Sequence, residues 1–337
     1  MLKTKFNLQF FADPSAANTT SSPKLKAEIK QYYEKELLKN FKPNLVHLQF
    51  GDRKPMPQGN GKKVEFRKIV PLSKSTTPLT EGVTPEAIEM AFSSLEAELK
   101  QYGGFTNYTD VLKFASIDPV ISTYNEELAS QGSLTMDSVC RDVLNTTTNV
   151  MYCSREAADG TETAVTTVAG IDSTCVFDLK EVFKAANILK RRNAKKIGDS
   201  FVCIAHPDVI TALMIANIGK GWIDVNKYSN AEKIFNGEVG KLGGLRFVET
   251  SEAKIEEVDG KVVYNTLVIG SKAYGVIDPE GMGMESIVKD LGETGFDPLN
   301  QRGTIGWKAM QATCILNPEY LLKVVSSTDV VTGATAN

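Results

Sequence analysis

Histidine is scarce in this sequence of 337 residues, which contains only His47 and His206. Neither stands in a motif such as His-x-x-x-His, so the sequence predicts no metal centre. The five cysteines never form Cys-x-x-Cys, which excludes a zinc knuckle or a dithiol redox motif and favours buried thiols in a reducing compartment. No apolar run approaches the roughly 18 residues that cross a bilayer, so we expect no membrane partner.

The motifs of common catalytic sites are missing as well. Residues 237–244 are rich in glycine, but they lack the Gly-Lys-Ser/Thr and Gly-x-Gly-x-x-Gly patterns of phosphate-binding loops. His206 and Asp208 could form an acid–base pair, although Asp208 is more simply explained as the cap of a helix that begins there. The sequence therefore predicts no catalytic residue and no cofactor. A soluble metabolic enzyme with a mixed α+β fold is kept as an alternative function.

Positive charge is concentrated at the start of the chain. Residues 1–74 contain 15 Lys and Arg against 6 Asp and Glu, a net charge of +9 (15 − 6). Because the whole chain carries −3, residues 75–337 carry −12 (−3 − 9). A basic start and an acidic remainder fit two kinds of partner, an external polyanion such as DNA or the acidic part of another copy of the same chain.

Residues 45–82 predict a basic β-hairpin. Asn60-Gly61 supplies the positive φ angles of a tight turn, and Val64 and Phe66 alternate with polar residues after it. A two-stranded ribbon is at best marginally stable by itself, so we expect its basic side chains to contact another subunit. These candidate contact residues are Arg53, Lys54, Lys62, Lys63, Arg67 and Lys68.

Two helices are expected in the first half of the chain. Residues 25–41 form an amphipathic pattern whose apolar stripe needs a partner surface. Asp118-Pro119 is a strong helix start, and the pattern continues to about residue 150, a length of about 48 Å. Gly132 and Ser133 lie near the middle of this helix and predict a hinge. Alternatively, Gly132 ends one helix and the next begins at Leu134.

Shorter elements follow in the second half of the chain. Asp178 and Glu181 form a capping box that predicts a helix through Arg192, and a second helix is expected between residues 207 and 217. Residues 91–109 fit either strands or a helix. Without regular βαβ alternation, the fold class is mixed α+β. Strands are expected at 200–206, 245–250, 262–269, 274–277, 304–316 and 321–325.

Six segments, taken in order, resemble the major capsid proteins of tailed phages, and above all the family of the N-four-like coliphage. Each segment alone is a weak signal, and their common order makes the resemblance specific over about residues 40–325. The segments are IVPLSKSTTPLTEGVTP, LKQYGGFTNYTDVLKFASIDPVI, RDVLNTTTNVMY, CIAHPDVITAL, NGEVGKLGGLRFVETSE and GTIGWKAMQATCILNPEYLLKV.

The resemblance implies the fold of the Hong Kong 97 phage capsid subunit. In that fold a spine helix, here residues 119–150, crosses the peripheral domain, and residues 91–109 become a strand pair. The implied parts are an N-arm (1–44), an E-loop hairpin (45–82), a peripheral domain (83–177), an axial domain (178–303) and closing strands that return to the peripheral domain before a C-terminal tail (304–337).

The same resemblance implies a structural protein and no enzyme. Its copies would form the hexamers and pentamers of an icosahedral shell in the virion, assembled in the cytoplasm of the host bacterium. Implied partners are a portal, scaffolding or decoration proteins, and packaged double-stranded DNA in non-specific contact. Some relatives join subunits by a Lys–Asn isopeptide bond; Lys62 and Lys63 would be the candidates, but no acceptor Asn can be placed. An encapsulin-type compartment shell is the alternative with the same fold.

Overall fold

The computed structural model describes most of the chain from residue 45 onward. The N-arm expected at residues 1–44 and the helix start at Asp118-Pro119 lie outside the described residues, as does Asn60 of the predicted turn. Not described after residue 44 are 58, 60, 71, 117–119, 157–160, 217–237, 282, 294–296 and 329–335.

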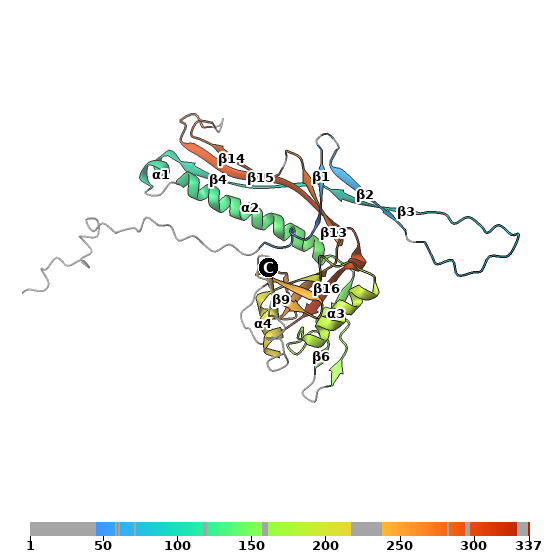
Figure 1. Ribbon diagram of the computed structural model, residues 1–337. Coiled ribbons are helices and arrows are strands. Elements are labelled where there is room, and N and C mark those ends of the chain that lie inside the picture. The colour runs from blue at the N-terminus through green and yellow to red at the C-terminus, as the bar shows by residue number, and fades with distance from the viewer. Residues whose placement is uncertain are drawn as a thin grey trace, which may run out of the picture. The chain divides into compact units, whose positions relative to one another are not determined.

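A first sheet is built around one long strand, β15, which pairs on both sides and lies beside the helix α2 (Figure 1). Its strand order is β1-β13-β15-β14, and β4 also pairs with β15, antiparallel over ten residue pairs. The short helix α1 (Asp110–Ala115) follows β4. The elements are β1 (Asp52–Met56), β4 (Lys100–Thr109), α2 (Val120–Asn145), β13 (Tyr274–Pro279), β14 (Glu285–Lys289) and β15 (Arg302–Ile315).

A second sheet has the order β5-β16-β12-β8-β10-β9, with β11 paired to β12. Two short strands, β6 (Arg155–Glu156) and β7 (Glu162–Thr163), form a separate hairpin. The elements of the second sheet are β5 (Val150–Tyr152), β8 (Phe201–Ala205), β9 (Glu238–Leu242), β10 (Leu245–Glu249), β11 (Ile255–Val258), β12 (Lys261–Ile269) and β16 (Leu321–Ser326).

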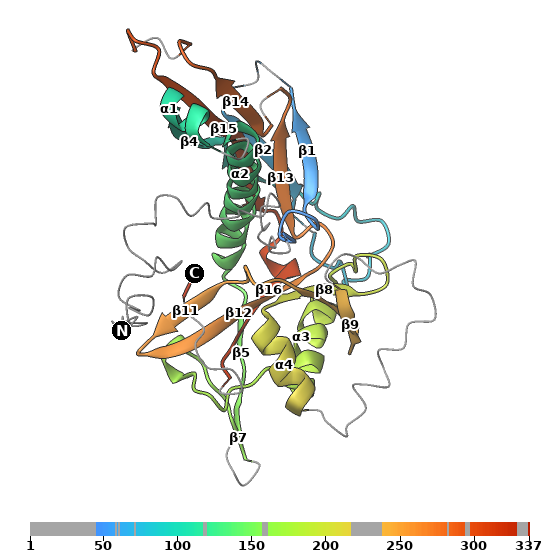
Figure 2. The ribbon, with the colours of Figure 1, turned by 90° about the vertical axis from the view of Figure 1, so that its left-hand side faces the viewer.

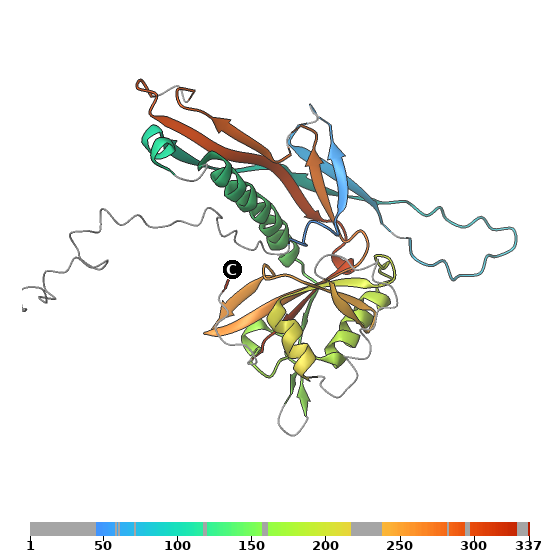
Figure 3. The same ribbon diagram turned by 60° about the vertical axis from the view of Figure 1, so that its left-hand side comes forward.

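The second sheet is covered on both faces. The helices α3 (Leu179–Arg191) and α4 (Pro207–Ala216) lie together on one face (Figure 2). The last turns of α2 pack against the other face (Figure 3). Successive residues of a strand point to opposite faces of its sheet. Because both faces are covered here, β8 is buried along its whole length. Phe201 and Cys203 join the cluster under α3 and α4, whereas Val202 and Ile204 join Cys140 and Leu144 of α2.

A two-stranded ribbon projects away from both sheets (Figures 1 and 3). It consists of β2 (Lys63–Ile69) and β3 (Phe92–Glu98), which pair antiparallel from Lys63 opposite Glu98 to Ile69 opposite Phe92. The predicted hairpin about Asn60-Gly61 is therefore wrong, because β1 pairs in parallel with β13 instead. The segment that contains Gly61 links β1 of the first sheet to β2 of the ribbon. The tip of the ribbon is the long loop 70–91.

Most local predictions are confirmed, and several boundaries change. The Asp178 carboxylate accepts a hydrogen bond from the Glu181 N–H at 2.9 Å and begins α3 as expected. Residues 91–109 form strands, but β3 pairs with β2 and β4 with β15. The long helix ends at Asn145, and α2 runs through Gly132 without a break, so the alternative of two helices is wrong.

Each sheet combines segments that are far apart in the chain. The strand β5 belongs to the second sheet and Phe177 to its core. Strands β13 and β14 pair with β15 in the first sheet. Of the closing strands, β15 lies in the first sheet and β16 in the second. The chain thus crosses between the two sheets several times, which local patterns do not reveal.

Candidate functional site

The loop 70–91 and the adjoining ends of β2 and β3 expose an unusual amount of apolar surface. Leu79 is 75% exposed, and large exposed apolar side chains recur along this stretch. Large apolar side chains that are exposed together on one segment mark an interaction surface. The residues are Ile69, Val70, Leu72, Leu79, Val83, Ile88, Met90, Phe92 and Leu95.

The charge of the ribbon changes sign along its length. The strand β2 is basic, whereas the loop 70–91 carries Glu81, Glu86 and Glu89 against Lys74, a net charge of −2 (1 − 3). The side chains of these three glutamates are exposed. The tip thus combines apolar and acidic side chains, which the expectation of a basic ribbon missed.

The six predicted contact residues do not form one patch. Arg53 and Lys54 lie on β1 at the edge of the first sheet. The Arg53 guanidinium lies 3.6 Å from the Asp278 carboxylate, and the Lys54 ammonium lies 3.7 Å from the Asp52 carboxylate. The other four lie on β2 or just before it. The predicted hairpin puts all six in one ribbon because it pairs the strand before Asn60-Gly61 with the strand after it.

The basic residues of the ribbon are largely paired within the chain. Lys63 lies 2.9 Å from Glu96 on β3, and this hydrogen bond raises the pKa of the lysine. Lys68 donates a hydrogen bond to Asn317, which joins the ribbon to the turn before β16, and Arg67 lies 4.0 Å from Glu65. Within the described residues, Lys62 has no charged or hydrogen-bonding side-chain partner. Exposed pairs of this type are weak and screened by salt.

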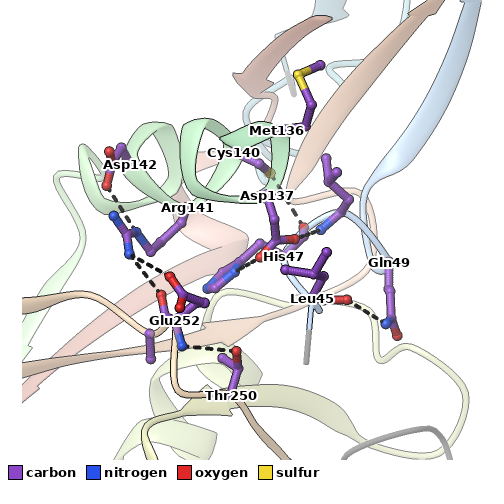
Figure 4. A network of polar contacts seen from close by, with 12 residues as sticks. Leu45, His47, Gln49, Met136, Asp137, Cys140, Arg141, Asp142, Thr250 and Glu252 are labelled. Atoms are coloured by element: carbon purple, nitrogen blue, oxygen red, sulfur yellow. Dashed lines mark hydrogen bonds and ion pairs between the residues drawn. The ribbon is translucent and has the colours of Figure 1, made fainter. Parts of the chain in front are cut away.

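A buried polar junction holds the segment that leads into β1 (Figure 4). His47 is 1% exposed, and its Nδ1 lies 2.7 Å from an Asp137 carboxylate oxygen on α2. The other oxygen of Asp137 accepts the Leu48 N–H at 3.2 Å. The His47 carbonyl accepts hydrogen bonds from the Cys140 thiol and the Tyr274 hydroxyl. One short segment is thereby tied to α2 and to β13.

The next turn of α2 extends this junction to the second sheet (Figure 4). Arg141 is buried and donates from its guanidinium to the Glu252 carbonyl at 3.1 Å and to the Asp142 carboxylate at 3.1 Å. The loop that holds Glu252 follows β10. The same burial raises the pKa of the Cys140 thiol to about 12 and keeps it protonated. The polar groups here position structural elements, and they were missed because their partners are distant in sequence.

Gly132 lies where α2 packs closely on β15. A Cβ at this position would meet Trp307 at 2.9 Å and the Met284 methyl at 2.8 Å. The indole N–H of Trp307 donates to Gln131 at 3.1 Å, which fixes the ring against the helix. Among the described residues, the Ser133 hydroxyl donates to the Ala129 carbonyl or, more weakly, to the Met284 sulfur. Close packing thus explains the glycine, and the hinge at Gly132 and Ser133 stays a prediction.

We therefore expect Gly132→Ala to lower the free energy of unfolding by about 1–3 kcal/mol, because the added methyl displaces the Trp307 ring. Guanidinium denaturation of the purified chain would measure this. The matched control is Ser133→Ala, which adds no atoms and is expected to change stability by less than about 0.5 kcal/mol. Equal stability of the two variants would contradict the packing explanation and favour the hinge.

The remaining candidate pair, His206 and Asp208, lies at the start of α4, where His206 Nδ1 is 3.2 Å from an Asp208 carboxylate oxygen. The helix α4 begins at Pro207, so Asp208 lies in its first turn and the expected cap at Asp208 is wrong. The Asp208 N–H donates to His206 Nδ1 at 3.2 Å, and its carboxylate accepts the Tyr264 hydroxyl at 2.8 Å. Burial lowers the pKa of His206. In the described part of the chain, no three His, Cys, Asp or Glu side chains gather as a metal site, and no helix has the length and apolarity to cross a membrane.

A long helix along one sheet, a second sheet covered by two helices, and a projecting ribbon define the fold of the Hong Kong 97 phage capsid subunit. Residues 93–324 match the family described as phage capsid protein. The chain belongs to this family, and it is a structural protein of the virion, as the sequence resemblance predicted.

Solved structures have the same fold at low sequence identity. The capsid of cyanophage P-SCSP1u is 13% identical with a TM-score of 0.67, over 97% of this chain and 100% of that one. The capsid of Ralstonia phage GP4 is also 13% identical with a TM-score of 0.67, over 95% and 100%. The SrpI encapsulin of Synechococcus elongatus PCC 7942 is 9% identical with a TM-score of 0.56, over 95% and 100%. Comparison with curated proteins yields no match.

Proposed function

We propose that this chain is the shell-forming subunit of a tailed phage or prophage, and that copies of it assemble into the hexamers and pentamers of an icosahedral shell. The observation that carries the proposal is the exposed apolar tip of the β2–β3 ribbon. Within its own subunit each of these described side chains stays at least 39% exposed. A neighbouring copy would bury them.

In this proposal the E-loop is the β2–β3 ribbon with its tip, residues 63–98, in place of residues 45–82. The peripheral domain corresponds to the first sheet with α2 as the spine helix, and the axial domain to the second sheet with α3 and α4. The division follows the two hydrophobic clusters of the second sheet and the packing of Trp307 on α2. The buried junction of His47 and Asp137 would set the direction in which the chain enters the E-loop.

Further partners follow from a role as shell subunit. A portal would occupy one vertex, scaffolding or decoration proteins could attach to the shell, and packaged double-stranded DNA would touch its inner surface without sequence preference. Assembly would take place in the cytoplasm of the host bacterium. An encapsulin-type compartment is the second candidate, favoured by the match to an encapsulin shell.

The test is electron microscopy and analytical ultracentrifugation of the purified chain. We expect closed or curved particles in equilibrium with free subunits. A chain that stays monomeric at every salt and protein concentration tried would contradict the proposal. Tails and DNA in particles from the native source identify a phage, whereas enclosed cargo proteins without DNA identify an encapsulin.

A further inference from the structure

A dense cluster of exposed cations follows α3. Five of the seven residues from 190 to 196 are Lys or Arg, although residues 75–337 together carry −12. A sixth cation, Lys272, lies beside this turn, because the Ser271 N–H donates to the Lys195 carbonyl at 2.7 Å. All six side chains are exposed. We call them the basic turn: Lys190, Arg191, Arg192, Lys195, Lys196 and Lys272.

The cations of the basic turn have no ion-pair partner within the described residues. Two carboxylates lie near the basic turn. The Asp199 carboxylate already has the Lys241 ammonium group 3.9 Å away. Glu319 lies on the short helix before β16, which is close to the turn because the carbonyl of Tyr320 accepts the Gly270 N–H. Counting Glu319 against the six cations leaves +5 (6 − 1). Cations in the last turn of a helix are favoured by its dipole, which accounts for Lys190 and Arg191. It does not account for the four that follow.

The backbone holds the basic turn rigidly. Asn193 adopts a left-handed conformation with φ 55°, and the Ala194 N–H donates to the Leu189 carbonyl at 3.0 Å, which closes the end of α3. Ile197 then pairs with Ser200 and leads the chain into β8. The charges are therefore presented on a fixed surface at the end of the second sheet where β8 begins. Arg191 and Arg192 also line a surface hollow with Asn149 and Ile188.

We infer that the basic turn binds the sugar–phosphate backbone of double-stranded nucleic acid. Guanidinium and ammonium groups without internal counterions fit a polyanion, and Phe183 is the one large apolar side chain that α3 exposes near them. The acidic loop tip of a neighbouring copy is the competing occupant. That tip exposes Leu79, Val83 and Ile88, and its complement should expose apolar side chains, since the buried centre of a protein interface is depleted in Lys.

This inference rests on the proposed shell function and adds an orientation to it. If the basic turn contacts packaged DNA, the end of the second sheet where β8 begins faces the interior of the shell. The contact would be independent of base sequence, because it reaches phosphates and no groove-reading element accompanies it.

The test measures binding of a fluorescent duplex of about 30 base pairs to the full chain by anisotropy, from about 50 to 200 mM salt. The variant Lys190→Gln, Arg191→Gln, Arg192→Gln, Lys195→Gln, Lys196→Gln should lose about tenfold or more in affinity. Its slope of log K against log salt should fall by about 0.9 for each lost phosphate contact. A matched control removes the same five charges elsewhere: Lys62→Gln, Lys63→Gln, Arg67→Gln, Lys74→Gln, Lys100→Gln.

An equal effect of the two variants, or none from either, would overturn the inference. Retained DNA affinity with lost particle formation would assign the basic turn to a contact between subunits instead, and this also overturns it. Particle formation is scored separately by electron microscopy. If the wild-type chain forms particles and the turn variant still binds DNA with wild-type affinity, the inference is overturned. The proposed function then remains intact.

Discussion

Removal of residues 73–89, with the loop closed by a short Gly-Ser turn, should abolish particle formation and leave the subunit folded. Described side chains between Leu72 and Leu95 are exposed, so the subunit's own core loses almost nothing. A neighbouring copy, in contrast, would lose the apolar surface of the tip. Burying one such side chain contributes about 1.5–3 kcal/mol, and a shell repeats the contact in every subunit.

A milder variant tests the chemistry of the same loop. Leu79→Ser, Val83→Ser, Ile88→Ser and Met90→Ser together should prevent assembly as the deletion does. The matched control on the same loop is Ser75→Ala, Thr77→Ala, Thr80→Ala and Thr84→Ala, which should still assemble. Electron microscopy scores particles, and thermal melting by circular dichroism checks the fold. Particles from the deleted chain, or a large drop in its melting temperature, would show that the loop is no E-loop.

Asp137→Ala should be among the most destabilising single changes in this protein, lowering the free energy of unfolding by about 2–5 kcal/mol. The Asp137 carboxylate is fully buried and accepts hydrogen bonds from His47 Nδ1 and the Leu48 N–H. Without it, both donors stay buried and unpaired. His47 Nε2 already lacks a partner among the described residues, so the ring cannot compensate through its other nitrogen.

Asp142, on the same helix, is the matched control. Its side chain is 54% exposed, and the buried Arg141 keeps the Glu252 carbonyl at 3.1 Å as a partner without it, so Asp142→Ala should cost less than about 1 kcal/mol. Urea denaturation of both variants separates the two expectations. If Asp137→Ala unfolds at the same urea concentration as Asp142→Ala, the buried junction does not stabilise the entry into the E-loop.

The two sets of changes report on different properties. The loop variants act on association and leave the monomer intact, whereas Asp137→Ala acts on the subunit itself. The junction ties His47 to both α2 and β13. A chain weakened there should therefore hold its β2–β3 ribbon in a less uniform orientation from copy to copy. Mixed or misshapen particles from Asp137→Asn, which retains an acceptor oxygen, would support this link.

Features with a local cause were predictable from the sequence. The start of α3 needs only the Asp178 side chain and the N–H three residues later, and the buried strand β8 needs only an unbroken apolar run. Short-range chemistry of this kind is written in neighbouring residues. The capsid fold itself was recognised from six ordered segments, none of which describes a contact.

Tertiary structure alone decided the rest. The strand β1 pairs with β13, more than two hundred residues away, and so the hairpin that the Asn60-Gly61 dipeptide predicts is not formed. Gly132 reads as a weak point in a helix until Trp307 is placed against it. His47 and Asp137 are 90 residues apart and become one buried pair only after α2 packs on the segment before β1. The sequence by itself determined the class of protein and its local elements, and packing between distant segments decided which strands pair, which charges are free and where the ribbon begins, because such contacts leave no local periodicity.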